Sequence, residues 1–160
     1  MLPGSSFPDV FSPLFRSSVR VGVAGSAPLN TDPYLLGVFM DNELDWTTHG
    51  NASVAQLYFS VIREELRRVL PDKLYLGAKQ GYPSEEVVAA AARYADVVSF
   101  DHYMYTASPA PGATLGESID APIIFAEFHF GALVRFTFCS CLNFCSVLPE
   151  FSFDLDSHLR

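Results

Sequence analysis

Apolar residues occur along this chain in short continuous runs that are separated by stretches with helical spacing. The continuous runs lie at residues 34–40, 73–79, 96–103 and 122–128. Runs of this length, without a polar residue at every second position, are typical of strands buried on both faces of a parallel sheet. We therefore predict four strands at these positions.

Two helices are predicted between the strands. In residues 52–70 apolar side chains recur at every third or fourth position, two arginines lie near the end, and Pro71 follows. Residues 85–95 follow Ser84, a suitable N-cap, and begin with two glutamates. Negative charge in the first turn stabilises the positive end of a helix dipole.

The order strand, helix, strand, helix, strand, loop, strand is that of parallel βα units, and it predicts an α/β fold. Open doubly wound sheets and (β/α)8 TIM barrels are both built in this way. Neither Gly-x-Gly-x-x-Gly nor Gly-x-x-x-x-Gly-Lys follows a predicted strand, which disfavours a nucleotide-binding sheet. A complete barrel needs about 250 residues, so four such units would form a partial barrel.

The two ends of the chain differ in character from its middle. Proline, serine and glycine are scattered through the first residues, so we predict an irregular N-terminal segment, 1–30, with at most one short element. The predicted strands and helices define a unit over 31–133. The tail, 134–160, has no charged residue from Phe136 to Pro149 and holds all three cysteines. It could be a divergent strand and helix, a misread or unspliced segment, or a Cys-x-Cys-x-x-x-Cys metal loop.

Composition and charge narrow the class of partner. With 160 residues, 49% of them hydrophobic and 18% charged, the chain can form one domain with a real core. The net charge of -8 argues against nucleic acid or an anionic membrane as the main partner, because both require a basic face. No apolar run has the length of a membrane span, and the N-terminus lacks the basic and apolar regions of a signal peptide. A neutral or polar substrate fits better.

Polar side chains follow every predicted strand at the point where it ends. In parallel βα units these ends share one face, which is where active sites are built. Glu127 is unusual, because it is a lone carboxylate among apolar and aromatic residues. Burying a charge there costs free energy unless the charge has a partner or a function. Asp41 and Asp45 have the simpler alternative of capping the next helix. The residues at the four ends are Asp41, Asn42 and Glu43; Lys79 and Gln80; Asp101, His102 and Tyr103; and Glu127 and His129.

Two chemistries are open to these residues. Asp101, His102 and His129 could be considered as metal ligands, but no paired-histidine or Cys-x-x-Cys spacing supports a metal, and we predict no metal and no cofactor. Glu43 and Glu127 at different strand ends suggest carboxylate-pair chemistry. Glycoside hydrolysis needs one protonated acid and one ionised carboxylate, and Trp46 could form a flat platform for a sugar ring.

The blocks DPYLLGVFMDNELDW, KLYLGAK, YADVVSFDHY and PIIFAEFHFGAL resemble, in order and spacing, those of (β/α)8 glycoside hydrolases that include β-agarases and β-galactosidase-like enzymes. FPDVFSP at residues 7–13 is a weaker match to a block that precedes strand four. The resemblance implies that the chain holds barrel strands four to seven. It stops sharply after Leu133, which favours the interpretation of the tail as a misread or unspliced segment.

The resemblance also implies roles for individual residues. Glu43 would be the general acid/base and Glu127 the nucleophile of a retaining reaction. Tyr103 would donate a hydrogen bond to the nucleophile. The other substrate-binding residues would be Asn42, beside the sugar hydroxyl next to the anomeric carbon, and Trp46, Lys79, Asp101 and His129.

The implied substrate is a β-galactoside-containing polysaccharide or oligosaccharide, and the family would allow an extracellular location. Strands one to three and eight are not recognisable, so we expect weak or no activity from the isolated chain. Two alternatives stay open. The chain could be a non-catalytic carbohydrate-binding or pseudo-enzyme fragment, or an open-sheet enzyme of different chemistry.

Overall fold

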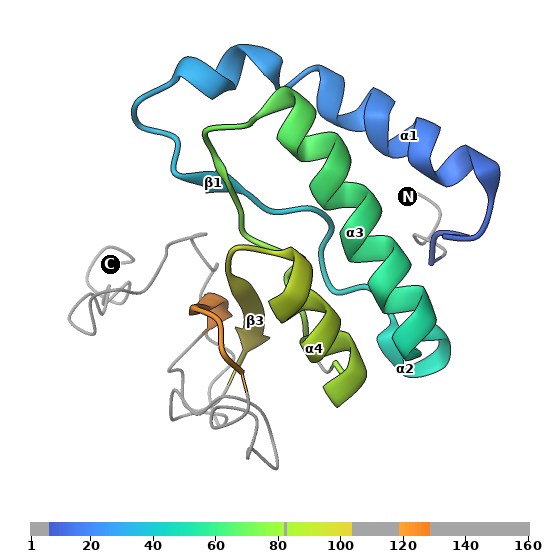
Figure 1. Cartoon of the computed structure of the whole chain (residues 1–160). Helices are drawn as coiled ribbons and strands as arrows, with labels where there is room; N and C mark the ends of the chain where they lie inside the picture. Colours follow the sequence, from blue (N-terminus) through green and yellow to red (C-terminus); the bar gives the residue numbers. More distant parts are fainter. Residues whose placement is uncertain (1–6, 82, 104–118, 129–160) are drawn as a thin grey trace, which may run out of the picture.

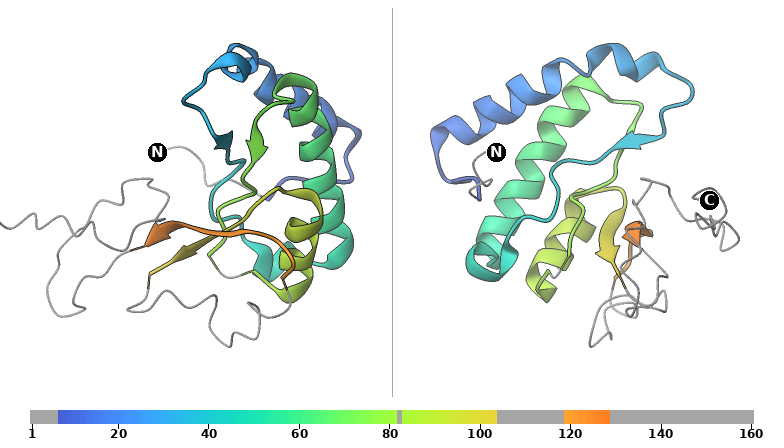
Figure 2. Two further views of the ribbon diagram at one scale, coloured as in Figure 1. Left: turned by 60° about the vertical axis from the view of Figure 1, so that its left-hand side comes forward. Right: turned by 180° about the vertical axis from the view of Figure 1, so that it is seen from behind.

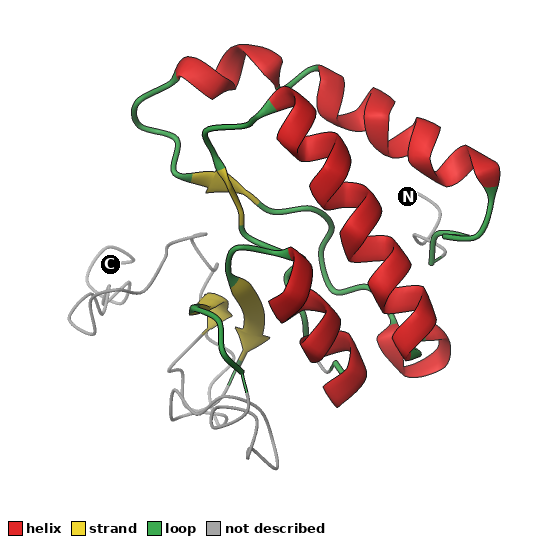
Figure 3. Ribbon diagram, in the orientation of Figure 1, coloured by secondary structure: helices red, strands yellow, loops and turns green. Residues whose placement is uncertain are grey.

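The computed structural model describes residues 7–81, 83–103 and 119–128, in which helices lie against a small set of parallel strands (Figure 1). Figure 3 shows the helices gathered on one side of the strands. In chain order the elements are α1 (Pro13–Ala24), the 3-10 helix η1 (Ala27–Thr31), β1 (Gly37–Val38), α2 (Trp46–His49), α3 (Ala52–Val69), β2 (Leu74–Tyr75), α4 (Glu85–Tyr94), β3 (Val98–His102) and β4 (Ile123–Phe128).

The strands are parallel and adjacent in the order of the sequence. β1 pairs with β2, and β3 pairs with β4. The isolated parallel bridge of Asn42 with Lys79 continues the pairing of β1 with β2 beyond their ends, and the bridge of Gln80 with Phe100 connects the segment after β2 to β3. The prediction of parallel strands joined by helices is therefore confirmed, although β1 and β2 are shorter than the apolar runs that contain them.

Among the described elements, α3 contributes the largest share of the buried hydrophobic residues. It begins at Asn51, whose Oδ1 accepts a hydrogen bond from the Val54 N–H at 3.0 Å, and it ends before Pro71. α1 and α4 both pack on α3, as the two views of Figure 2 show. Its buried face consists of Ala55, Tyr58, Phe59, Val61, Ile62, Glu65 and Leu66. Tyr58, Val61, Ile62 and Leu66 of this face follow the predicted helical spacing, whereas Ala55, Phe59 and the carboxylate Glu65 are additional buried residues.

Residues 7–30 are largely helical, which corrects the expectation of an irregular segment with at most one short element. They include α1, twelve residues long, whose Phe15, Val19 and Val23 are buried. Pro13 and Pro28 lie in the first turns of α1 and η1, where a proline does not break a helix. Pro13 occupies the first turn of α1 after the cap Ser12, whose Oγ accepts from the Leu14 N–H at 3.2 Å. The division of the chain at residues 30 and 133 stays a prediction, and the tail 134–160 lies outside the described residues.

None of the helices in the described ranges is long and apolar enough to cross a membrane. Over the same residues the strands form an open arrangement with no closed barrel.

A buried carboxylate connects α1 to α3. The Glu65 side chain is 1% exposed and accepts hydrogen bonds from Arg16 at 2.9 Å and from Arg20 at 3.0 Å. The hydrogen bond from Arg20 is the main cause that lowers the pKa of Glu65 to about 2, with Arg16 and Arg68 acting in the same direction against desolvation. The ionised form of Glu65 thus fixes α1 on the domain.

We predict that Glu65→Gln lowers the free energy of unfolding by about 1–3 kcal/mol, because the buried charge-assisted hydrogen bonds are lost. Glu64→Gln is the control. Glu64 is 55% exposed and bonded to Arg16 alone, so its loss should cost less than about 1 kcal/mol. Urea unfolding followed by circular dichroism measures both, and equal effects of the two substitutions would contradict the assignment.

The same pair predicts a pH dependence. The pKa of Glu65 is lowered on folding, so its stabilisation is fully present above its ordinary pKa of 4.5 and is lost as the pH falls towards 2. The difference in stability between the parent chain and Glu65→Gln should therefore shrink over that interval.

Candidate active site

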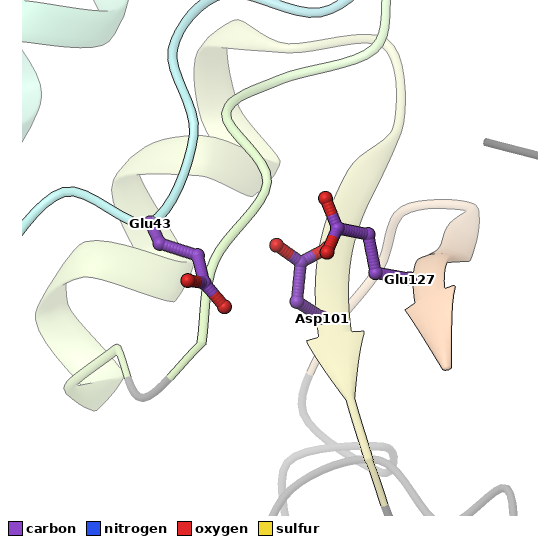
Figure 4. A group of neighbouring side chains, drawn as sticks. All are labelled: Glu43, Asp101 and Glu127. Atoms are coloured by element: carbon purple, nitrogen blue, oxygen red, sulfur yellow. The ribbon is translucent and has the colours of Figure 1, made fainter. Parts of the chain in front are cut away.

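Three carboxylates from separate segments converge at the carboxyl ends of the strands. One carboxylate oxygen each of Glu43, Asp101 and Glu127 lies within 4.8 Å of the other two. Figure 4 shows the three side chains directed into the same space, Glu43 from the turn after β1, Asp101 from β3 and Glu127 from β4. Parallel strands bring their carboxyl ends to one edge, which is why residues far apart in the sequence meet here.

Glu43 is held by a turn with unusual backbone geometry. Asp41 and Glu43 have φ angles of 65° and 45°, in the left-handed region that residues other than glycine rarely adopt. The Glu43 N–H donates to the Lys79 carbonyl at 2.8 Å, and the Lys79 N–H donates to the Asp41 carbonyl at 3.4 Å. Such strain persists where the surroundings impose it, and it gathers at functional sites.

A second contact fixes the turn from the helix layer. The buried Tyr58 on α3 donates its hydroxyl to Asp41 Oδ2 at 2.5 Å. Tyr58 is not recognisable from the sequence as part of the site, because it fits the apolar pattern of its helix. The signal that could have found it is that a buried tyrosine hydroxyl needs a hydrogen-bond partner.

A β-bulge places Glu127 on the face of Asp101. Phe100 pairs with Phe125, but the next pair is Asp101 with Glu127, so Ala126 is an extra residue in β4. Paired residues of parallel strands point to the same side, and without the bulge Asp101 would face Ala126. The bulge therefore determines that the two carboxylates meet.

The surroundings of Glu127 favour its ionised form. The Lys79 ammonium forms an ion pair with Glu127 Oε1, and the Tyr103 hydroxyl donates to Glu127 Oε2. The Lys79 hydrogen bond and then the Tyr103 hydrogen bond lower the pKa of Glu127, against a smaller desolvation effect. Asp101 is in the opposite situation, because burial and then the charge of Glu127 raise its pKa to about 7. Neighbouring carboxyls whose pKa values are driven apart are the usual basis of acid and base roles.

Three other residues named from the sequence, Asn42, Asp45 and His129, lie in different surroundings. Asn42 is exposed beside Glu43, bridged to Lys79 through the backbone, where a ligand can reach it. Asp45 caps α2, with Oδ1 accepting from the Thr47 N–H at 3.0 Å, as the simpler alternative foresaw. His129 lies outside the described residues.

Trp46 requires a correction. It is 2% exposed and packs edge-on against Phe7 and Tyr58 and face-on against Phe59, at ring-centroid distances of 5.0, 5.4 and 5.8 Å. Because both faces of its ring are inside the core, it offers no platform to a sugar in this structure. An indole next to polar residues predicts a binding surface, but here its hydrophobic area is buried at the start of α2.

The carboxylates are close enough to hold a cation, yet the charges nearby argue against one. Lys79 already supplies a positive charge to Glu127, and a metal ion would be repelled by it. Of the metal ligands considered from the sequence, Asp101 belongs to this cluster and His102 does not, while His129 lies outside the described residues. The imidazole of His102 lies 5.6 Å from the Phe125 ring, centroid to centroid.

We predict that Lys79→Met raises the pKa of Glu127, because the ion pair that favours the carboxylate is removed. Titration of the side-chain carboxyl carbon of Glu127 by NMR measures this. Lys73→Met is the matched control, since Lys73 donates to the Asp32 carbonyl, away from the site. An unchanged or lower midpoint for Glu127 in Lys79→Met would contradict the electrostatic role.

We also predict that Tyr58→Phe loosens the turn that carries Glu43. Loss of the hydroxyl should cost about 1–2 kcal/mol of stability and should speed hydrogen exchange at the Glu43 N–H, which bonds to Lys79. Tyr34→Phe, at a side chain that is 96% exposed, serves as control. If exchange at Glu43 is the same in both variants, the hydroxyl does not fix the turn.

Two curated proteins that are similar to the chain are both β-agarases. No family model matches the chain. Over 77 residues it is 39% identical to β-agarase B of Vibrio sp. (strain JT0107), and over 82 residues it is 38% identical to β-agarase A of the same organism. These matches cover 47% and 48% of this chain, but it spans only 8% of the length of either enzyme.

Solved structures agree with the sequence matches. The crystal structure of an agarase superimposes with a TM-score of 0.69 and 30% identity, over 79% of this chain and 27% of the agarase. An exo-β-agarase at 22% identity has the same TM-score, covers 81% of this chain and 28% of its own, and supports the fold alone. The parallel strands and helices thus match one part of the agarase structures. The chain is related to the β-agarase glycoside hydrolases and corresponds to one part of them.

Proposed function

We propose that this chain carries the catalytic carboxylates of a retaining glycoside hydrolase that cleaves a β-galactoside-containing polysaccharide, as β-agarases do. One observation carries the proposal. Glu43 and Glu127 come from different strand ends, and their carboxylate oxygens approach within 4.8 Å. Retaining enzymes hold their two carboxyl groups about 5–5.5 Å apart, whereas inverting enzymes leave room for a water molecule between them.

Glu127 is the nucleophile in this proposal. Its ion pair with Lys79 and its hydrogen bond from Tyr103 keep it ionised, as attack on the anomeric carbon requires. A lone pair of Glu127 forms the bond to the anomeric carbon while the bond to the glycosidic oxygen breaks. The product is a glycosyl ester on Glu127 and a free leaving group.

Glu43 is the general acid and base. As an acid it gives its proton to the departing glycosidic oxygen, and it is left as the carboxylate. It then takes a proton from the water that attacks the glycosyl ester, which releases the sugar with its original anomeric configuration and restores both glutamates. The Lys79 carbonyl holds the Glu43 backbone in place for both steps.

The remaining predicted residues bind the sugar. Asn42, exposed next to Glu43, would bond the hydroxyl beside the anomeric carbon. Lys79 and Asp101 line the same space through side chains from neighbouring strands. In this proposal the described strands are strands four to seven of a (β/α)8 barrel, which is supported by the parallel order β1 to β4 and by the match to agarase structures.

Turnover assays test the function. We expect the chain to hydrolyse agarose and an aryl β-galactoside weakly, since its described residues contribute four of the strands that surround such a site. Glu127→Gln should abolish both activities. Glu43→Gln should slow agarose hydrolysis by about 10²–10⁴-fold. For an aryl galactoside with a good leaving group it should lower kcat/KM much less, because formation of the glycosyl ester then needs no proton, whereas kcat still falls because water attack on the ester needs the base.

Glu64→Gln is the control for these assays, because Glu64 lies exposed on α3, away from the carboxylate cluster. Turnover that survives both Glu43→Gln and Glu127→Gln would contradict the assignment. Agarose binding without turnover by the parent chain would favour the alternative, a non-catalytic carbohydrate-binding role.

A further inference from the structure

Asp101 is the carboxyl that a two-glutamate mechanism does not use. Its side chain is buried, with 4% of the residue exposed, and neither Oδ1 nor Oδ2 has a hydrogen-bond partner among the described residues. It nevertheless points into the cluster, where its oxygen lies within 4.8 Å of those of Glu43 and Glu127 (Figure 4). An ionised carboxylate that is buried without hydrogen-bond donors costs free energy, which favours the neutral, protonated form of Asp101.

The charged groups around Asp101 do not offer it a cation of its own. Glu43 faces it from the turn after β1, and Glu127 faces it from β4. The nearest ammonium, Lys79, is paired with Glu127, and the Tyr103 hydroxyl also donates to Glu127. Two carboxyls on either side, and no hydrogen bond to its oxygens from any donor of the described residues, favour a proton on Asp101.

We propose that Asp101 is a third functional carboxyl of this site, which holds a proton between the two glutamates and thereby sets the charge state in which they act. Its catalytic consequence rests on the proposed glycosidase function. In this role Asp101 is a positioning residue, because it acts through Glu43 and Glu127. The pKa of Asp101 is raised to about 7 by burial, by Glu127 and by Glu43, against the lowering effect of Lys79.

The sign of the coupling follows from the charges. Below pH 7 Asp101 is neutral, and Glu127 stays ionised through Lys79 and Tyr103. As the pH rises through that value, Asp101 gains a negative charge beside Glu127, and the two carboxyls interact as a coupled pair.

Carboxyl-carbon NMR titration of the parent chain and of Asp101→Asn tests the proposal without any substrate. In the parent chain we expect the Asp101 carbon to titrate near pH 7, with a simultaneous step in the signals of Glu43 and Glu127. In Asp101→Asn that step should vanish from both glutamates. Asp120→Asn, at an exposed position, is the matched control and should leave it in place.

Titration of Asp101 near its ordinary value of 3.8 would overturn the proposal, as would a step near pH 7 that persists in the glutamates of Asp101→Asn. The parent titration is decisive by itself if the variant does not fold. The outcome is also separate from the glycosidase proposal. If turnover requires Glu127 but Asp101 titrates near its ordinary pKa, only the proposal for Asp101 is rejected. If the titration is coupled but there is no turnover, only the glycosidase proposal is rejected.

Discussion

Lys79 is the residue on which the geometry of the site depends, because it holds both glutamates at once. Its backbone accepts from the Glu43 N–H and donates to the Asp41 carbonyl, so it fixes the left-handed turn after β1. Its side chain forms an ion pair with Glu127 on β4. Lys79 therefore contacts both the turn that carries Glu43 and the side chain of Glu127. The distance between these two carboxylates follows from the way the strands are paired.

The same few residues give the carboxyls different charge states. Glu127 receives an ammonium and a hydroxyl, both of which favour its ionised form. Asp101, one strand away, receives neither and is buried, which favours its proton. An ionised carboxylate beside a protonated one suits a reaction that alternates nucleophilic attack with proton transfer. This does not depend on which sugar occupies the remaining subsites.

The sequence predicted the helices α3 and α4, the parallel strands and the carboxylates at the strand ends, because these depend on local apolar patterns and on one rule about strand ends. It did not predict the bulge at Ala126, since nothing in PIIFAEF distinguishes a regular strand from one with an extra residue. The sequence did not predict α1, because prolines usually indicate a loop, whereas Pro13 lies in the first turn of this helix. Trp46 was misassigned because a single sequence does not tell a core indole from a binding one. The roles of the site residues stay predictions.

The central claim is that Glu127 attacks the sugar and forms a covalent bond to it. The most direct measurement is the mass of the chain after incubation with a 2-deoxy-2-fluoro-β-galactoside that has a good leaving group, followed by peptide mapping. The fluorine slows hydrolysis of the glycosyl ester, so the account predicts one added fluorosugar on the peptide that contains Glu127 and none in Glu127→Gln. A chain that stays unlabelled, or one labelled at another residue, would contradict it.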